Sequence, residues 1–181
     1  EHGLSHNVVD TPIVNKDMID VVVDADENLY DPAKLREIIR RRLTEHNVDV
    51  RLNTRADVDE LAEFDFIVVA TYANLNDAFK GRSESHREYQ YEVCEKIVVT
   101  IPDALKNTSI VVMDGPFMCF DPLGDTGNAV MGHVEHAVHH RSVGHTPEIP
   151  DEFVPLLNRG VVINPPVSNA KKFLEDAVRY L

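Results

Sequence analysis

The sequence has no tryptophan, only two cysteines, and no uninterrupted apolar run of the length that a membrane-spanning helix needs. Such a helix takes about 20 consecutive apolar residues, so we expect no membrane partner. Basic residues are also scarce, with 18 Lys and Arg against 31 Asp and Glu and a formal net charge of -13. Because a surface of that sign repels phosphate groups, we expect no nucleic acid or anionic lipid as a partner.

Cys94 and Cys119 are too few for the disulfide framework of a small secreted protein, and we expect both to be buried as small hydrophobic residues. The first six residues have neither the basic start nor the apolar stretch of a signal peptide. Both observations indicate a protein of the reducing cytoplasm. The 181 residues, 43% of them hydrophobic, are enough to bury a core in one domain or two small ones.

The first half of the chain alternates short apolar runs with one helical pattern. The runs at 19–23, 48–52 and 64–71 predict strands, and the last is continuously apolar, as in a strand that is buried on both faces. Asp31 can accept hydrogen bonds from the first amides of a helix, which we expect to end near Asn47. This order of strand, helix and strands predicts part of an α/β nucleotide-binding core.

The second half has strands with one polar face. Alternating apolar residues predict strands over 89–101, 109–120 and 128–138, which would form an antiparallel meander. A final helix with one apolar face follows, and Ser168 is placed to cap it. The expected fold class is therefore α+β, with a partial nucleotide-binding α/β core, an inserted antiparallel β-meander and flanking helices.

Four of the eight residues from His133 to His140 are histidines. On a helix, His133 and His136 would share one face and could hold a metal ion such as zinc. The neighbouring valines favour a strand instead, on which these two side chains would point to opposite sides. We therefore expect no metal site here, and a metal-binding domain that uses this cluster ranks third among the functions considered.

Five short motifs occur in a characteristic order along the chain. They are Asn28-Leu29-Tyr30-Asp31-Pro32-Ala33-Lys34-Leu35, Asn47-Val48-Asp49-Val50, Phe64-Asp65-Phe66-Ile67-Val68-Val69-Ala70-Thr71, Met113-Asp114-Gly115-Pro116-Phe117-Met118 and Asp121-Pro122-Leu123-Gly124-Asp125-Thr126-Gly127. In this order the chain resembles the middle of flavin-dependent oxidoreductases of the D-amino acid oxidase and glycine oxidase superfamily. The resemblance covers roughly residues 13 to 140.

The resemblance implies a parent enzyme that binds FAD and oxidises a small molecule, namely an amine, an amino acid or a hydroxy acid, by hydride transfer to the flavin. It also implies four segments. They are a substrate-domain strand at 1–25, part of the FAD-binding domain at 26–80, an antiparallel substrate-binding domain at 81–150 and a helical segment of the substrate domain at 151–181.

The same resemblance places two groups of residues near the reaction. Those expected beside the cofactor are Ala56, Ala70, Thr71, Tyr72, Ala73 and Asn74, with Ala56 at the adenosine end. Those expected to line the substrate pocket, from their positions on the meander, are Tyr89, Tyr91, Met118 and His133. No residue stands out as a general base, so the catalytic residues stay unassigned.

The chain departs from the family in two places. Tyr72 stands where the family usually has the glycine of an Ala-Thr-Gly-Ala sequence. The fingerprint Gly-x-Gly-x-x-Gly, which brings the backbone against the pyrophosphate, is missing. In this family it lies upstream of the strand with which this chain begins.

The missing fingerprint makes the chain resemble an internal fragment, which alone we expect to be inactive. Cutting a nucleotide-binding domain exposes apolar sheet surface, so we also expect self-association. The alternative is a non-catalytic acidic α/β binding or interaction module, whose charge of -13 would engage a basic partner.

Overall fold

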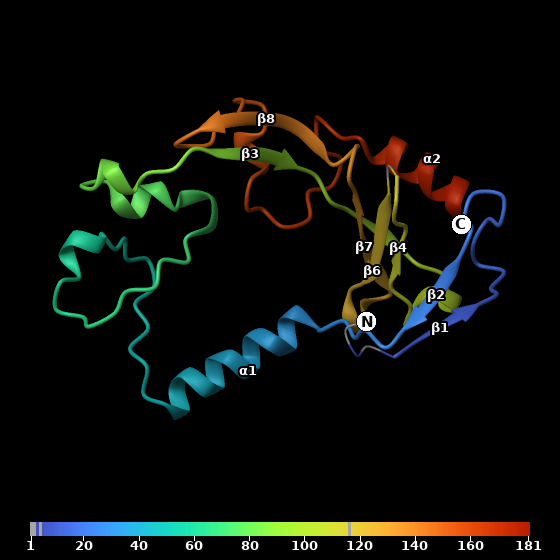
Figure 1. Cartoon of the computed structure of the whole chain (residues 1–181), viewed down its shortest axis with the longest axis horizontal. Coiled ribbons are helices and arrows are strands. Elements are labelled where there is room, and N and C mark those ends of the chain that lie inside the picture. Colours follow the sequence, from blue (N-terminus) through green and yellow to red (C-terminus); the bar gives the residue numbers. More distant parts are fainter. Residues whose placement is uncertain (1–2, 4, 116) are drawn as a thin grey trace. The chain divides into compact units, whose positions relative to one another are not determined.

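The computed structural model describes residues 3, 5–115 and 117–181. Glu1, His2 and Leu4 lie outside the described residues, as does Pro116 of the fourth family-like motif. The chain divides into two compact units (Figure 1). Unit 1 comprises Glu1–Arg40, Glu95–Ala137 and Val161–Leu181, and unit 2 comprises Arg41–Cys94 and Val138–Gly160.

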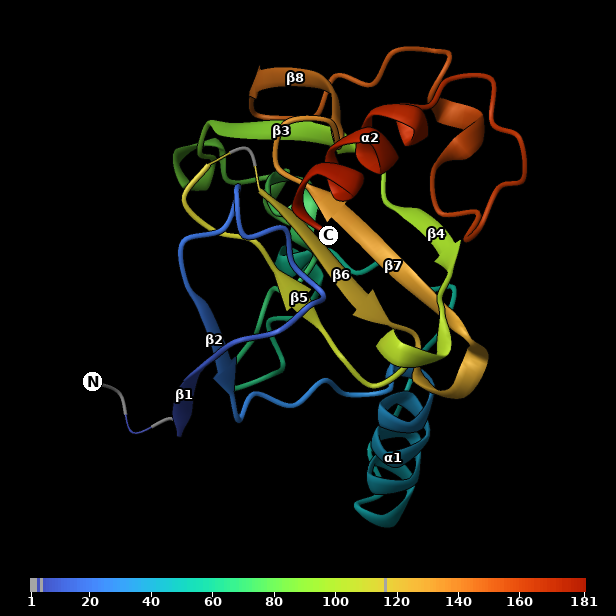
Figure 2. The ribbon, with the colours of Figure 1, turned by 90° about the vertical axis from the view of Figure 1, so that its right-hand side faces the viewer.

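Unit 1 contains two antiparallel sheets and one of the α-helices. A hairpin joins β1 (His6–Val9) to β2 (Val22–Ala25). A four-stranded sheet has the order β4 (Ile97–Thr100), β7 (Asn128–His133), β6 (Met118–Pro122) and β5 (Ile110–Val111). Figure 2 shows helix α2 (Ala170–Tyr180) lying beside β6 and β7. Unit 1 also has short 3₁₀ helices at Asp103–Leu105 and Gly124–Thr126.

The core of unit 1 lies between this sheet and α2. Its buried residues are Ile97, Ile101, Met118, Phe120, Ala129, Met131, Phe173 and Tyr180. Phe173 has no exposed surface, and Tyr180 lies two turns further along the same helix. The apolar face predicted for the last helix is confirmed in part. Of its residues, Ala170, Phe173, Ala177 and Leu181 pack in or against the core, whereas Leu174 and Val178 are exposed.

The N-terminus of α2 has two side-chain partners. Ser168 Oγ accepts the amide of Ala170 at 3.0 Å, so it contributes to the start of the helix, but the N-cap position is Asn169, one residue later than predicted. Glu95 accepts the amide of Asn169 at 2.8 Å through its second carboxylate oxygen and also bonds the Ser168 hydroxyl. The carboxylate of Glu95 thus anchors the start of a helix more than 70 residues further along the chain.

Unit 2 is built around the antiparallel pair of β3 (Tyr89–Cys94) and β8 (Val138–Gly144). Short 3₁₀ helices precede and follow the pair, at Val58–Glu60, Tyr72–Asn74, Asn76–Phe79, Ser83–Ser85 and Val154–Leu156. Asn76 is buried, and its side-chain amide donates to the carbonyls of Arg87 at 2.7 Å and His145 at 2.6 Å. These bonds tie the 3₁₀ segment to the end of β8.

Helix α1 (Pro32–Glu45) begins where the sequence predicts. Asp31 Oδ1 accepts the amides of Ala33 at 2.8 Å and Lys34 at 3.2 Å. The backbone hydrogen bonds from Lys34 and Ala33 hold the pKa of the Asp31 carboxyl below its ordinary value. The predicted cap and start of this helix are therefore confirmed.

The α+β class with antiparallel sheets is confirmed, and every strand pair in the described part of the chain is antiparallel. The expected strands at 48–52 and 64–71 are wrong for this chain, because both stretches are irregular. Phe66 and Val68 are 92% and 89% exposed. A strand buried on both faces needs neighbours at its edges and layers on its faces, and the described residues supply neither.

The meander strands are shorter than predicted, and two of the predicted strands change sheet. The stretch 89–101 divides between β3 and β4, and 128–138 divides between β7 and β8. The division occurs where the amide of Glu95 donates to the carbonyl of Ala137 at 2.8 Å. Each of these two predicted strands therefore contributes residues to two different sheets.

The cysteine expectation is only partly met. Cys94 is exposed on β3, whereas Cys119 is half-buried on β6, and the two belong to different sheets. Cys94 is exposed because it ends a two-stranded pair with little cover. Within the described residues, no helix combines the length and the apolar character that crossing a bilayer requires.

Candidate functional site

An open depression of about 730 Å³ lies in unit 2. Three parts of the unit line it, namely residues 71–74, residues 90–94 of β3, and the segments 147–149 and 157–158 that follow β8. The depression thus combines Thr71–Asn74, expected beside the cofactor, with Tyr91, expected in the substrate pocket. The sequence separates these two sets by a change of predicted domain, and the fold of unit 2 brings them together.

Tyr72 has an unusual backbone conformation at the edge of this depression. Its φ is 53°, in the left-handed region that glycine adopts readily and an aromatic residue rarely does. Its side chain is 92% exposed. The position where the family-like pattern has glycine therefore has a glycine-like backbone here.

Tyr91 is held in the wall of the depression. Its hydroxyl donates to the carbonyl of His145 at 3.1 Å, and its ring meets that of Tyr89 edge to face at 6.2 Å. Tyr89 is 38% exposed and is not among the lining residues. Of the two tyrosines expected in the pocket, the structure places Tyr91 there.

The charged groups in the lining are carboxylates. Glu92 accepts from Arg141 Nε at 2.8 Å and from the Gln90 amide at 3.0 Å. The hydrogen bond from Arg141 is the main reason that the pKa of Glu92 is below its ordinary value. Glu148 is the second acid, and no lysine or arginine is among the lining residues. The surface suits neutral or cationic molecules better than anions.

The remaining predicted site residues lie elsewhere. Ala56 and Ala70 are exposed and do not line the depression. Met118 and His133 belong to unit 1 and are 1% and 5% exposed, so neither has surface with which to line an open pocket. Met118 is part of the hydrophobic core, as expected of an apolar residue on an inner strand.

A polar cluster in unit 1, which we call the histidine clasp, consists of the buried His133 and the partly buried His136 and Asp176. Asp176 Oδ2 lies 3.1 Å from His133 Nε2 and 3.0 Å from His136 Nε2. The two rings are stacked, with centroids 4.3 Å apart and planes 18° from parallel. The expectation that these rings point to opposite sides is wrong, because β7 ends at His133 and a turn brings His136 back beside it.

The hydrogen bonds of the histidine clasp define the tautomer of His133. Its Nδ1 lies 3.1 Å from the amide nitrogens of both Glu135 and His136, and both amides donate to it. Nδ1 therefore carries no proton, and in the neutral ring the proton is on Nε2. Nε2–H then donates to Asp176.

Burial and charge set the ionisation of the histidine clasp. Burial, followed by the nearby charge of His136, lowers the pKa of His133 against the opposing effect of Asp176. For Asp176, burial acts to raise the pKa, but hydrogen bonds and charge from His136 and hydrogen bonds from Arg179 and His133 together lower it. The stable state is an ionised Asp176 beside a neutral His133.

The histidine clasp is also the one group in the described part of the chain with enough close ligand atoms to test for a metal ion. Both Nε2 atoms face the same Asp176 oxygen, so a shared metal ion would have to displace these two hydrogen bonds. A metal-bound His133 Nε2 would also need its proton on Nδ1, facing two amide donors. A histidine ligand normally donates this proton to an acceptor. The geometry does not fit a shared metal ion.

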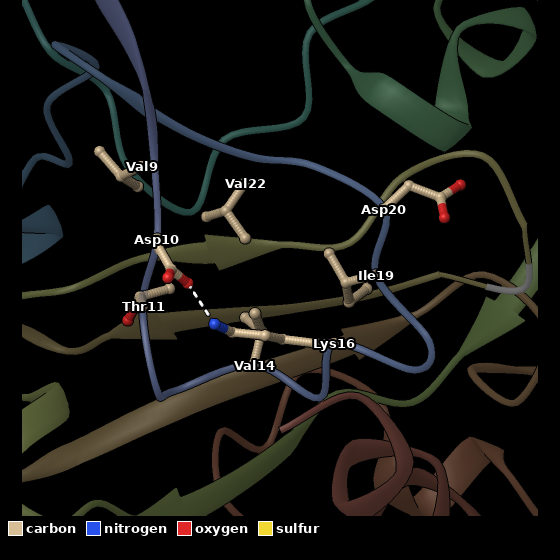
Figure 3. A pocket seen from close by; sticks show the side chains of 8 residues that line it. All are labelled: Val9, Asp10, Thr11, Val14, Lys16, Ile19, Asp20 and Val22. Carbon is tan, nitrogen blue, oxygen red and sulfur yellow. Dashed lines mark ion pairs between the residues drawn. The ribbon is translucent and has the colours of Figure 1, made fainter.

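A smaller hollow of about 250 Å³ lies in the loop between β1 and β2. Figure 3 shows Lys16 and Asp10 pointing toward one another across it, with Nζ 2.5 Å from Oδ1. Asp20 points away from this pair in the same view. Because its lysine and its facing acid are already paired, the hollow presents no convergent polar groups to a ligand.

Comparisons of the chain with models of protein families, with curated proteins and with solved structures find no match. The sequence patterns did not identify Asp176 or Glu95 as structural partners. The hydrogen bond of Asp176 to His133 spans more than 40 residues of sequence, and that of Glu95 to Asn169 spans more than 70. One local signal existed for Asp176, since it follows Phe173 by three positions and so shares the inner face of α2.

Proposed function

We propose that this chain is part of an FAD-dependent oxidoreductase that oxidises an amine, an amino acid or a hydroxy acid. The observation that carries the proposal is that Tyr72, which stands where the family-like sequence has glycine, has a φ of 53°, a conformation that glycine adopts readily. This φ is unusual for an aromatic residue, and it falls at the position where the chain departs from the resemblance.

The depression in unit 2 gives a second support. It joins residues 71–74 to Tyr91, so the segments proposed to face the cofactor and the substrate share one surface. Its carboxylates favour an amine among the proposed substrates, and the phosphates of the cofactor would bind outside this depression. In the proposed enzyme the flavin accepts the hydride. The task of this chain is to hold the substrate carbon in place and to exclude water. Tyr91 is suited to this because its hydroxyl is already fixed by the carbonyl of His145.

The exposed apolar segments give a third support. Leu35, Ile38 and Ile39 on one face of α1 are 39%, 39% and 47% exposed, and Phe66 and Val68 of unit 2 are exposed as well. Apolar surface of this extent marks an interaction site or a missing cover. In our proposal this apolar surface is covered in the parent enzyme, and the stretches 48–52 and 64–71 form no strands here.

The proposal narrows the candidate residues. Thr71, Tyr72, Ala73 and Asn74 remain beside the cofactor, with Ala70 next to them and Ala56 at the adenosine end. Tyr91 is the substrate-pocket residue, and Tyr89 supports it through the edge-to-face contact. Met118 and His133 are better explained by the core of unit 1.

The test begins with the coding DNA on both sides of this segment. We expect, upstream and in frame, a strand followed by Gly-x-Gly-x-x-Gly and a helix. The product of the complete reading frame should show the visible absorption of a bound flavin. This absorption should bleach when the oxidisable substrate is added without oxygen. A colourless product whose reading frame has no such fingerprint would overturn the proposal.

The second candidate is the acidic binding module. It is favoured by the net charge of -13 and by the carboxylates of the depression, Glu92 and Glu148. A colourless product that binds a cationic protein, and releases it as salt is raised, would support this candidate instead.

A further inference from the structure

The histidine clasp lies at the contact between α2 and the end of β7 in unit 1, and it shares no residue with the depression that the flavin proposal uses. His133 has a side chain with no exposed surface, and its ring meets that of Phe173 edge to face at 5.7 Å. Asp176 is one turn further along α2. The same helix therefore contributes both the apolar and the ionised neighbour of His133.

We propose that the histidine clasp holds α2 against the end of β7 in a pH-dependent way, and that this contact opens when His133 takes up a proton. The argument rests on the two amide groups that donate to Nδ1 of His133. An imidazolium carries a proton on both nitrogens and accepts no hydrogen bond. Protonated His133 would therefore turn an N–H toward two other N–H groups, in a place closed to water.

The charged groups around His133 do not remove this conflict. The turn contributes Glu135 and His136, and α2 contributes Asp176 with Arg179, whose Nη1 lies 3.3 Å from Asp176 Oδ1. Asp176 already accepts the proton on Nε2 of neutral His133, so a second proton gains no new acceptor. The protonated ring can satisfy Nδ1–H only after the turn at 134–137 opens.

His136 responds differently, because its Nε2 lies beside Asp176 and its side chain is 19% exposed. A protonated His136 keeps a donor on Nε2 and can pair with the ionised carboxylate. The lowered pKa of Asp176 keeps this carboxylate charged in the mildly acidic range. We therefore assign the pH-dependent opening to His133 and not to His136.

The direction of the pH effect follows from linkage. Burial lowers the pKa of His133 in the folded state, so the open state binds the proton more readily. The stabilisation is fully present above the ordinary histidine pKa of about 6.5. It is lost as the pH falls from there through the lower pKa of the folded state. Opening should release the buried face of Phe173 from the sheet.

Hydrogen exchange of α2 amides tests this proposal in the whole chain. From about pH 7.5 to about pH 5.5, a site with an open-state pKa of about 6.5 should open about tenfold more often. We expect this increase for residues 170–180, after correction for the intrinsic pH dependence of exchange, and not for the amides of α1. Equal corrected exchange of α2 at both pH values would overturn the proposal.

Two variants assign the effect to His133. His133→Asn keeps an oxygen for the two turn amides but cannot titrate, and it should remove the acid response of α2. His136→Gln cannot titrate at its own position and should leave the response in place. The reverse pattern would overturn the assignment.

A measurement on the unmodified chain covers the case in which a variant does not fold. Nitrogen NMR of the imidazoles should find His133 neutral with its proton on Nε2 wherever α2 is protected. A protonated His133 beside a protected α2 would contradict the proposal.

Discussion

The ring of His136 lies face to face with that of His133, and both rings direct Nε2 to the same oxygen of Asp176. This stacked pair shares one carboxylate oxygen as its common hydrogen-bond partner. These hydrogen bonds connect α2 to the turn after β7, so we expect the helix and this end of the sheet to unfold together. The consequences for stability can be measured residue by residue.

Asp176→Ala should destabilise the chain by about 1–3 kcal/mol, because it leaves the buried Nε2–H of His133 without an acceptor. The matched control is Glu175→Ala, which removes a carboxylate from the exposed side of α2, where it pairs with Lys171 at 3.6 Å. The control should change stability by less than about 0.5 kcal/mol. Urea unfolding measures both variants, and equal losses would contradict this account of the histidine clasp.

Phe173→Ala should cost about 3–5 kcal/mol, because it removes a fully buried ring from the core of unit 1. Leu174→Ala, at the next position of the same helix, removes a side chain that is 47% exposed and should cost much less. Thermal unfolding of the two variants compares the two faces of α2. A similar loss for both would mean that α2 does not cover the sheet as described.

Tyr72→Gly should leave stability unchanged or increase it. A left-handed residue other than glycine costs about 1–2 kcal/mol, and the entropy of glycine in the unfolded chain offsets about 0.5–1 kcal/mol of the gain. Tyr89→Gly, on β3, should destabilise the chain because glycine weakens strand interiors. A clear loss for Tyr72→Gly would remove the observation that carries the proposed function.

Phe66→Ser with Val68→Ser should reduce self-association of the isolated chain, because these side chains are 92% and 89% exposed in one apolar segment. Sedimentation velocity at several protein concentrations measures the effect. Val178→Ser is the control, since Val178 is 79% exposed on α2 but lies outside that segment. A chain that stays monomeric without any substitution would contradict the expected self-association.

Local signals in the sequence were sufficient for the helices. Asp31 is read correctly as the start of α1, since its partners are two and three residues away. The apolar face that contains Phe173 is read correctly because helical spacing decides it. The antiparallel character of the second half also follows from alternation along each strand.

The breaks in the strands could not be predicted in the same way. The stretch 89–101 changes sheet at Glu95, whose carboxylate bonds residues 168 and 169 of unit 1. The turn at 134–137 depends on two amides that converge on one ring nitrogen of His133. The first cause is a tertiary contact and the second is a local side-chain hydrogen bond in a turn, and hydrophobic periodicity reports neither.

The candidate site, too, could be predicted from the sequence only in part. Residues 71–74 and Tyr91 were selected by resemblance, and their common depression depends on how unit 2 folds. The apolar run 64–71 is typical of a buried strand, but the described residues form no strand there. An apolar pattern indicates that a segment requires cover, and it does not show which other segment provides that cover.

The visible absorption spectrum of the complete gene product tests the central claim most directly. The account predicts a flavin bound in stoichiometric amount, which the substrate bleaches in the absence of oxygen. Tyr91→Ala should weaken the substrate response, whereas Tyr30→Ala, at an exposed tyrosine outside the depression, should leave it unchanged. A product that binds no flavin would contradict the account.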